Sequence, residues 1–218
     1  MKKVNVTIVD YGNGNLYSVQ KACESVGLNV IISADKKVIE SADAIILPGV
    51  GAFADAMDNL KSLDLISPIH YFVETGKPLL GICLGMQLLL TESEEFGIQK
   101  GLNLMEGTCK KFPALGSSGQ KIRVPQINWN TIYPTNGNNF EADTPLANIK
   151  SGEYMYFVHS YFAQLENPEQ RLSLTDYEGI EYCSSIRKKN IFAFQFHPEK
   201  SGKIGLGVYQ KFKELITK

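Results

Sequence analysis

The stretch PLLGICLGMQLLL, Pro78–Leu90, decides the fold of this chain. An apolar run over 78–82 leads into Cys83, and a second apolar run over 84–90 leads away from it with a single polar residue, Gln87. The first run is short, as a buried strand is, whereas the second has helical length and good helix formers. We therefore predict a strand that enters a helix through a sharp turn at Cys83.

Two glycines, Gly81 and Gly85, flank Cys83 at two residues to either side. This G-x-C-x-G pattern is the cysteine form of the nucleophile elbow, in which a Cβ at either flank would clash with nearby backbone. The turn would place the sulfur at a helix N-terminus, where free N–H groups and the helix dipole favour the nucleophilic thiolate. The alternative is a buried structural cysteine, because free cysteine is among the most buried residue types.

Composition sets the broad class. The chain has 218 residues, 44% of them hydrophobic, which suits one α/β domain spanning 1–218 with a full core. A formal net charge of −1 does not indicate binding to nucleic acid or to an anionic membrane. No apolar stretch approaches the roughly 20 residues of a membrane span. No CxxC spacing joins the four cysteines, so we expect separate thiols in a cytoplasmic protein rather than a disulfide or zinc framework. We expect no metal and no cofactor.

The order of apolar runs predicts a mixed architecture. In the first part of the chain, short β-rich runs alternate with helical patterns, which favours a parallel sheet covered by helices on both faces. The strands are expected over 4–10, 29–33 and 44–47, and the helices over 16–26, 52–60 and 66–75. After Gly107 the runs become short and β-like, over 107–112, 121–125, 129–133, 154–162, 172–176, 182–187 and 191–197, before a closing helix over 204–216. We therefore expect an α/β fold with an antiparallel-rich second half.

Two glycine-rich turns follow early strands. Gly12 and Gly14 suggest a dinucleotide loop, but Tyr17 stands where the third glycine of G-x-G-x-x-G belongs, so a plain strand-to-helix turn is favoured. Its position at the end of a strand still makes it a candidate surface for a ligand or partner. The second turn, Pro48–Gly51, is either a plain turn or the donor of an oxyanion-hole N–H facing Cys83.

A base for the cysteine is sought among three histidines, His70, His159 and His197. His197 ends a β-like run and is followed by Pro198 and Glu199. In an extended segment, residues i and i+2 point the same way, so His197 and Glu199 are expected to face one site. A carboxylate beside an imidazole fixes its tautomer and stabilises the imidazolium. Cys83, His197 and Glu199 thus form a candidate nucleophile, base and orienting group. The alternative, an edge-strand histidine beside a solvated glutamate, is disfavoured because the pair and the elbow both lie at strand ends.

Four motifs together resemble one family. They are PGVGAF over 48–53, GICLGMQLL over 81–89, YFVHSY over 156–161 and FQFHPEKS over 194–201. This set resembles the class I glutamine amidotransferases, and more narrowly the glutaminase subunits of imidazole glycerol phosphate synthase, over residues 4–216. The resemblance implies a flavodoxin-like three-layer sandwich that hydrolyses L-glutamine to glutamate and ammonia. It also implies a heterodimer with a (β/α)8-barrel synthase subunit, which uses the ammonia to form imidazole glycerol phosphate and AICAR in histidine biosynthesis.

The resemblance also implies roles for individual residues. Cys83 would attack the glutamine amide, His197 would transfer protons, and Glu199 would orient the imidazole. The oxyanion hole would combine the Leu84 N–H with the Val50–Gly51 peptide. The residues that would bind the glutamine are Gln87, Glu95, Ser160 and Tyr161. The residues that would lie at the partner interface are Asn13, Trp129, Tyr156 and Lys200.

One segment departs from the family pattern. The family usually reads P-H-M-G-W-N, whereas residues 125–130 read PQINWN, so that Gln126, Ile127 and Asn128 replace His, Met and Gly. The departure leaves Cys83, His197 and Glu199 intact. It bears on the identity of the partner, and therefore on the acceptor of the ammonia. An alternative is therefore a paralogous glutaminase subunit that supplies ammonia to a sugar amidotransferase of surface polysaccharide biosynthesis.

Two further classes compete with an amidotransferase subunit. A free-standing hydrolase or protease would use the same elbow but leaves Trp129 without a role. A catalytically silent scaffold subunit is disfavoured by the intact set of Cys83, His197 and Glu199.

Overall fold

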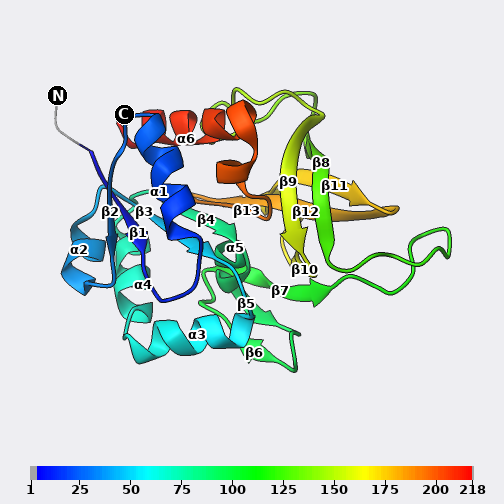
Figure 1. Ribbon diagram of the computed structural model, residues 1–218, viewed down its shortest axis with the longest axis horizontal. Coiled ribbons are helices and arrows are strands. Elements are labelled where there is room, and N and C mark those ends of the chain that lie inside the picture. The colour runs from blue at the N-terminus through cyan, green and yellow to red at the C-terminus, as the bar shows by residue number, and fades with distance from the viewer. Residues whose placement is uncertain (1–3, 218) are drawn as a thin grey trace.

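The computed structural model describes residues 4–217, in which one 13-stranded mixed sheet connects both parts of the chain (Figure 1). At one end of the sheet, neighbouring strands are parallel and follow the order β2-β1-β3-β4-β13. These strands are β1 (Asn5–Val9), β2 (Asn29–Ser33), β3 (Ala44–Gly49), β4 (Leu79–Cys83) and β13 (Ile191–Phe194). β3, β4 and β13 are buried along their whole length, which explains their continuous apolar runs.

Helices cover both faces of this parallel region. Ile46 of β3 packs with the buried residues of α1 (Leu16–Ser25) and α6 (Gly202–Ile216). Its neighbour Ile45 packs on the opposite face, with buried residues of α2 (Lys36–Ser41), α3 (Phe53–Ser62) and α4 (Ile66–Glu74). Successive strand residues point to opposite faces of a sheet, so two cores lie on its two sides. The expected three-layer α/β sandwich is therefore confirmed.

The second half of the chain is mainly antiparallel, as expected. β12 pairs antiparallel with β13, β10 and β11, and β10 pairs antiparallel with β7. A hairpin of β8 and β9 pairs from Gln126–His159 to Ile132–Glu153 and joins the sheet through β11, at the right of Figure 1. The strands are β7 (Met105–Lys111), β8 (Gln126–Pro134), β9 (Glu153–His159), β10 (Tyr161–Leu165), β11 (Arg171–Tyr177) and β12 (Ile180–Lys188). The 3-10 turns η1 (Pro168–Gln170) and η2 (Pro198–Lys200) complete this part.

Some predicted elements are wrong in extent. The helix expected over 84–90 ends early as α5 (Leu84–Leu88), and the chain continues as β5 (Leu90–Ser93), which pairs with β6 (Gln99–Lys100) and β7. The run 84–90 is buried on every side, and an apolar run without periodicity does not distinguish a helix from a strand. The strand expected over 154–162 is broken at Ser160, and no strand forms over 121–125.

Helix α2 was not predicted from the sequence; Asp35 caps its N-terminus by accepting from two backbone N–H groups. Across residues 4–217, no helix has the length and apolar character needed to cross a membrane.

Candidate active site

The elbow forms where β4 ends and α5 begins. Cys83 stands at this junction with a positive φ of 53°, a conformation that L residues rarely adopt. A Cβ on Gly85 would overlap the carbonyl oxygen of Leu47, and a Cβ on Gly81 would lie 2.9 Å from that of Ala193. The flanking glycines are therefore required by close approach of neighbouring strands. Because α5 has only 5 residues, its nearby N–H groups rather than a long helix dipole act on the sulfur.

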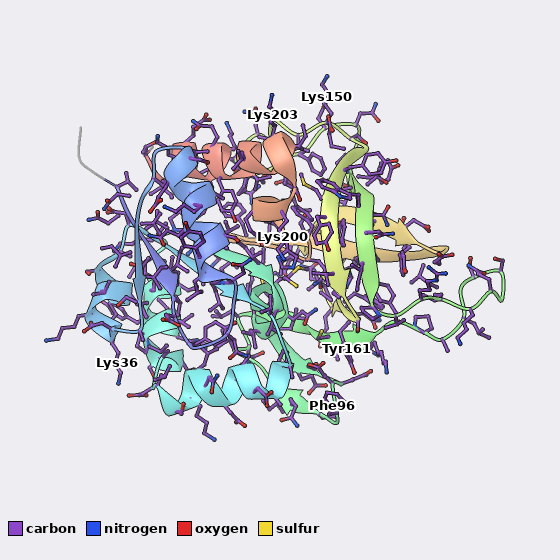
Figure 2. All side chains as sticks on the ribbon, in the orientation of Figure 1. Lys36, Phe96, Lys150, Tyr161, Lys200 and Lys203 are labelled. Carbon is purple, nitrogen blue, oxygen red and sulfur yellow. The ribbon has the colours of Figure 1, made fainter. Side chains whose placement is uncertain are left out.

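A cavity of about 400 Å³ opens beside Cys83 and is lined by both parts of the chain. This volume lies within the range of small-molecule sites. Figure 2 labels two of the lining residues, Lys200 and Tyr161, near the junction between the helix-covered sheet and the hairpin. The cavity brings together every residue that the sequence suggested for the oxyanion hole and the substrate site: Val50, Gly51, Leu84, Gln87, Glu95, Ser160 and Tyr161.

His197 and Glu199 meet as expected, but through a different backbone. His197 Nδ1 lies 2.8 Å from Glu199 Oε1, and both side chains are 2% exposed. The expected extended segment is wrong, because residues 198–200 form the 3-10 turn η2. The other ring nitrogen, Nε2, is buried and has no nitrogen or oxygen partner within residues 4–217. It is therefore free to take a proton from sulfur.

The electrostatics of the pair favour a protonated imidazole. Burial opposes the charge of His197, but the Cys83 sulfur and the Glu199 carboxylate outweigh burial and raise the pKa of His197 to about 10. A cysteine facing an imidazolium is activated as a nucleophile. The arrangement can therefore perform covalent catalysis on a carbonyl group bound in the cavity.

A buried tyrosine supports the loop that was suggested as an oxyanion-hole donor. Tyr11 is fully buried, and its hydroxyl donates to the Pro48 carbonyl at 2.6 Å. Burial raises the pKa of Tyr11 far above its usual range, so the hydroxyl keeps its proton. A Cβ on Gly49 would overlap that hydroxyl, and Gly51 has a φ of +107°. Tyr11 was not predicted from the sequence, where its only signal was its place at the end of a strand.

Hydrogen bonds hold two polar side chains of the cavity wall in place. Gln87 Nε2 donates to the carbonyl of Tyr161 at 3.0 Å. Glu95 lines the cavity, and its Oε2 accepts from the Phe53 N–H at 2.6 Å, at the start of α3. The helix N-terminus stabilises this carboxylate in place. Glu95 is therefore a fixed negative group, suited to a ligand's ammonium.

His159 also lines the cavity but cannot act as its base. Its Nδ1 donates to the Tyr161 carbonyl at 2.8 Å, and its Nε2 lies 3.2 Å from the hydroxyl of Tyr182. Burial, together with the nearby His197, outweighs the Tyr161 hydrogen bond and lowers the pKa of His159 to about 3. The imidazole is thus neutral. Gln126, one of the three replaced positions, is fully buried beside it and accepts from Tyr182 at 3.0 Å.

The residues suggested for a partner interface fall into two places. Trp129 is 50% exposed and packs edge-on against Tyr156, and the ammonium of Lys200 lies 5.9 Å from the Tyr156 ring centre. Asn13 lies elsewhere, beside Gly51, where its Oδ1 accepts from the Asn59 amide at 2.9 Å. Both places border residues that line the cavity.

The described residues offer no set of side chains that could bind a metal ion. Within residues 4–217, no three His, Cys, Asp or Glu side chains are grouped so that they could hold a metal ion. All four cysteines are free and buried. Cys83 is the one among them that lines the cavity.

Comparisons with known proteins place this site in a family. The family model described as "Glutamine amidotransferase class-I" matches residues 7–212. The chain therefore belongs to the class I glutamine amidotransferases, and it is an enzyme of that class.

Curated relatives narrow the class. The chain is 44% identical over 211 residues to the imidazole glycerol phosphate synthase subunit HisH 1 of Legionella pneumophila (strain Paris), covering 97% of this chain and 99% of the relative. It is 44% identical over 217 residues to subunit HisH of Aquifex aeolicus (strain VF5), covering 99% of each. This agreement bears out the narrower resemblance. A structure titled "Structure of PurLQS from Thermotoga maritima" shares the fold with a TM-score of 0.70 and 22% identity, covering 97% of this chain and 98% of that one.

Proposed function

We propose that this chain is the glutaminase subunit of an imidazole glycerol phosphate synthase. It would hydrolyse L-glutamine and pass the ammonia to a (β/α)8-barrel synthase subunit in a heterodimer. The observation that carries the glutaminase chemistry is the contact of the buried His197–Glu199 pair with Cys83, which lines a cavity of about 400 Å³. The relatives named as synthase subunits support the choice of partner.

The reaction follows from the geometry in two halves. The Cys83 thiol gives its proton to His197 Nε2, and the sulfur attacks the side-chain carbonyl carbon of glutamine. N–H groups at Leu84 and at the Val50–Gly51 peptide stabilise the oxyanion. The C–N bond breaks as His197 protonates the nitrogen, which leaves as ammonia. Water then attacks the thioester, gives a proton to His197 and releases glutamate as the C–S bond breaks.

Polar groups of the cavity wall would select an α-amino acid. Glu95, fixed at the start of α3, would bind the ammonium of glutamine, and the backbone of Ser160 and Tyr161 would bind its carboxylate. Gln87 already donates to Tyr161, so it would hold this part of the site in register with Cys83.

The outer face of the β8–β9 hairpin is the surface we assign to the barrel subunit. It exposes four large side chains, Ile127, Trp129, Tyr133 and Tyr154, and the same hairpin contributes residues that line the cavity. Exposed aromatic and aliphatic side chains of this kind are typical of an interface core. Ile127 and Asn128 are exposed replacements on this hairpin, and they favour a second candidate, a sugar-pathway synthase as the acceptor of ammonia.

The test compares glutamine hydrolysis by the purified chain alone and with the barrel subunit of the same cell plus its nucleotide substrate. We expect strong stimulation by the complex. Cys83→Ala should abolish glutamine-dependent synthesis, at least a thousandfold, because the nucleophile is lost. The same variant should retain synthesis from added ammonium salt. Cys23→Ala, which removes a buried thiol that does not line the cavity, is the matched control.

The outcomes separate the hypotheses. Equal loss of glutamine- and ammonia-dependent synthesis in Cys83→Ala would contradict a separate glutaminase site. Hydrolysis by the chain without any stimulation by the barrel subunit would reject that partner and favour the sugar-pathway alternative.

A further inference from the structure

Gln195 lies beside the proposed nucleophile and has no role in the reaction as written so far. It follows the last residue of β13, and its backbone N–H still donates to Ser184 at 2.9 Å, as in a continued strand. The rings of Phe194 and Phe196 stack at 5.0 Å in the apolar core. Alternation therefore directs Gln195 away from these rings, and its fully buried side chain reaches the Cys83 sulfur.

Both ends of the Gln195 amide have partners. Its Nε2 lies 3.7 Å from Cys83 Sγ, and its Oε1 accepts from Gln87 Nε2 at 3.1 Å. Gln87 Nε2 also donates to the Tyr161 carbonyl at 3.0 Å. A continuous set of hydrogen bonds thus runs from the Tyr161 carbonyl through Gln87 and Gln195 to the Cys83 sulfur.

A backbone carbonyl fixes the direction of these bonds. The two ends of an amide side chain are told apart by their hydrogen-bond partners. The Tyr161 carbonyl can only accept, so the Gln87 group facing it must be the NH2 group. That same NH2 group faces Gln195, which must present its oxygen there. The Gln195 NH2 group therefore points at the Cys83 sulfur.

The donor and the acceptor at the sulfur favour different protonation states. The Val158 carbonyl lies 3.8 Å from Cys83 Sγ and can interact only with the S–H form. The Gln195 N–H donates to sulfur, and such a bond strengthens when the sulfur is charged. When the S–H proton moves to His197 Nε2, the S–H interaction with the Val158 carbonyl is lost. The hydrogen bond from the Gln195 N–H to the sulfur becomes stronger.

We propose that Gln195 is a further catalytic residue, whose amide N–H stabilises the Cys83 thiolate through attack and through departure of the sulfur. The inference rests on the proposed glutaminase function and adds a group that touches the reacting atom. Its tie to Gln87 would also keep the sulfur in register with the bound substrate.

The test measures the rate of iodoacetamide alkylation of Cys83 against pH, read from the Cys83 peptide by mass spectrometry. Gln195→Met keeps the shape of the side chain but removes the donor. Gln87→Met is the comparison, because it breaks the bond to the Gln195 oxygen and leaves the amide at the sulfur. Ser185→Ala, which removes a buried hydroxyl of neighbouring β12, is the control for folding.

In Gln195→Met we expect the midpoint of the alkylation profile to rise by about one pH unit, because a hydrogen bond to a charged group is lost. The kcat for glutamine should fall about tenfold to a hundredfold with little change in KM. Gln87→Met should raise KM and leave the midpoint unchanged. Ser185→Ala should match the wild type.

A folded Gln195→Met with an unchanged midpoint and kcat would overturn the proposal. A rise in KM alone would mean that Gln195 only positions Gln87, and this result would also overturn the proposal. If Gln195→Met does not fold, Gln195→Asn, whose shorter amide cannot reach the sulfur, carries the same expectations. Failure of the proposed function is distinguishable, because the wild-type chain would then not hydrolyse glutamine either alone or with the barrel subunit.

Discussion

The elbow and the β8–β9 hairpin build opposite sides of one cavity by different means. At the elbow, the glycines of residues 81–85 meet backbone or side chains of neighbouring strands, and Cys83 is 6% exposed. On the hairpin, one face carries Phe157 and His159 into an aromatic cluster, while the other leaves Trp129 half exposed. The elbow is complete within this chain, whereas the outer face of the hairpin has an apolar surface still open to solvent.

This difference separates substitutions that should change the stability of the fold from substitutions that should change only its binding to a partner. Changes at the elbow should disturb packing directly. Changes on the inner face of the hairpin should act through burial of polar groups, and changes on its outer face should leave the fold intact. Three variants, one for each place, can break or sharpen this comparison.

The elbow variant is Gly85→Ala, for which we expect the largest loss of stability. The added methyl group would overlap the Leu47 carbonyl oxygen, which belongs to β3 and cannot move alone. We expect the free energy of unfolding to fall by about 4 kcal/mol or more, measured by urea denaturation. Glutamine hydrolysis should be lost as well, because the same turn carries Cys83.

Gly207→Ala in α6 is the matched control. The nearest atom to its added methyl would be Ile149 Cδ1 at 3.7 Å, an ordinary contact, and alanine favours a helix. This variant should be neutral or slightly more stable. If Gly85→Ala unfolded at the same urea concentration as the wild type, the elbow would not be fixed by close packing.

The inner face of the hairpin is tested through the pH dependence of stability, with His159→Gln. Burial lowers the pKa of His159 to about 3, so below about pH 6.5 the unfolded chain binds a proton that the folded chain excludes. The free energy of unfolding should therefore fall as the pH drops from about 6.5 to about 3, by up to about 1.4 kcal/mol per pH unit from this group. His159→Gln should reduce the slope of stability against pH by about one proton across that window.

His197 has the opposite effect on the pH dependence of stability. It therefore checks whether the acid slope belongs to His159. Its pKa is raised to about 10, so its stabilisation is fully present below about pH 6.5 and is lost as the pH rises through about 10. His159→Gln should leave this alkaline loss unchanged. An acid slope equal to that of the wild type would show that His159 does not titrate as a buried neutral group.

The elbow was predictable from sequence because its constraints are local. The spacing of Gly81, Cys83 and Gly85 reports a turn at which neighbouring strands approach so closely that a Cβ on either glycine would clash. The family, the fold class and the enzyme class were likewise read correctly from the motifs and are confirmed. The single domain over 1–218 and the roles of the site residues stay predictions.

What sequence reasoning missed depends on contacts between distant segments. Gln195 meets Cys83 across 112 positions, and Tyr11 meets Pro48 across 37, so neither contact can be read from local spacing. The turn η2 was taken for an extended segment because i, i+2 spacing alone does not separate the two. Gln126 belongs to this group too, since only the fold shows that it is buried against Tyr182 rather than at the surface.

The outer face of the hairpin gives the smallest expected change in stability, with Trp129→Ala. The side chain is 50% exposed and its closest aromatic neighbour is Tyr156, so the free energy of unfolding should change by no more than about 0.5 kcal/mol. If this face binds the barrel subunit, the affinity of the complex should fall at least about tenfold, because tryptophan is a frequent interface hot spot. Titration of stimulated glutamine hydrolysis with the barrel subunit measures that affinity.

Tyr71→Ala provides the matched control for this last variant. Tyr71 is an aromatic residue of α4 that is 56% exposed, and it does not line the cavity. Both variants should fold as the wild type does, and only Trp129→Ala should weaken the complex. If both variants bound the barrel subunit with equal affinity, the docking surface would lie elsewhere than on the hairpin. A large loss of stability in Trp129→Ala would mean that the outer face is part of the fold itself, and the contrast with the elbow would then fail.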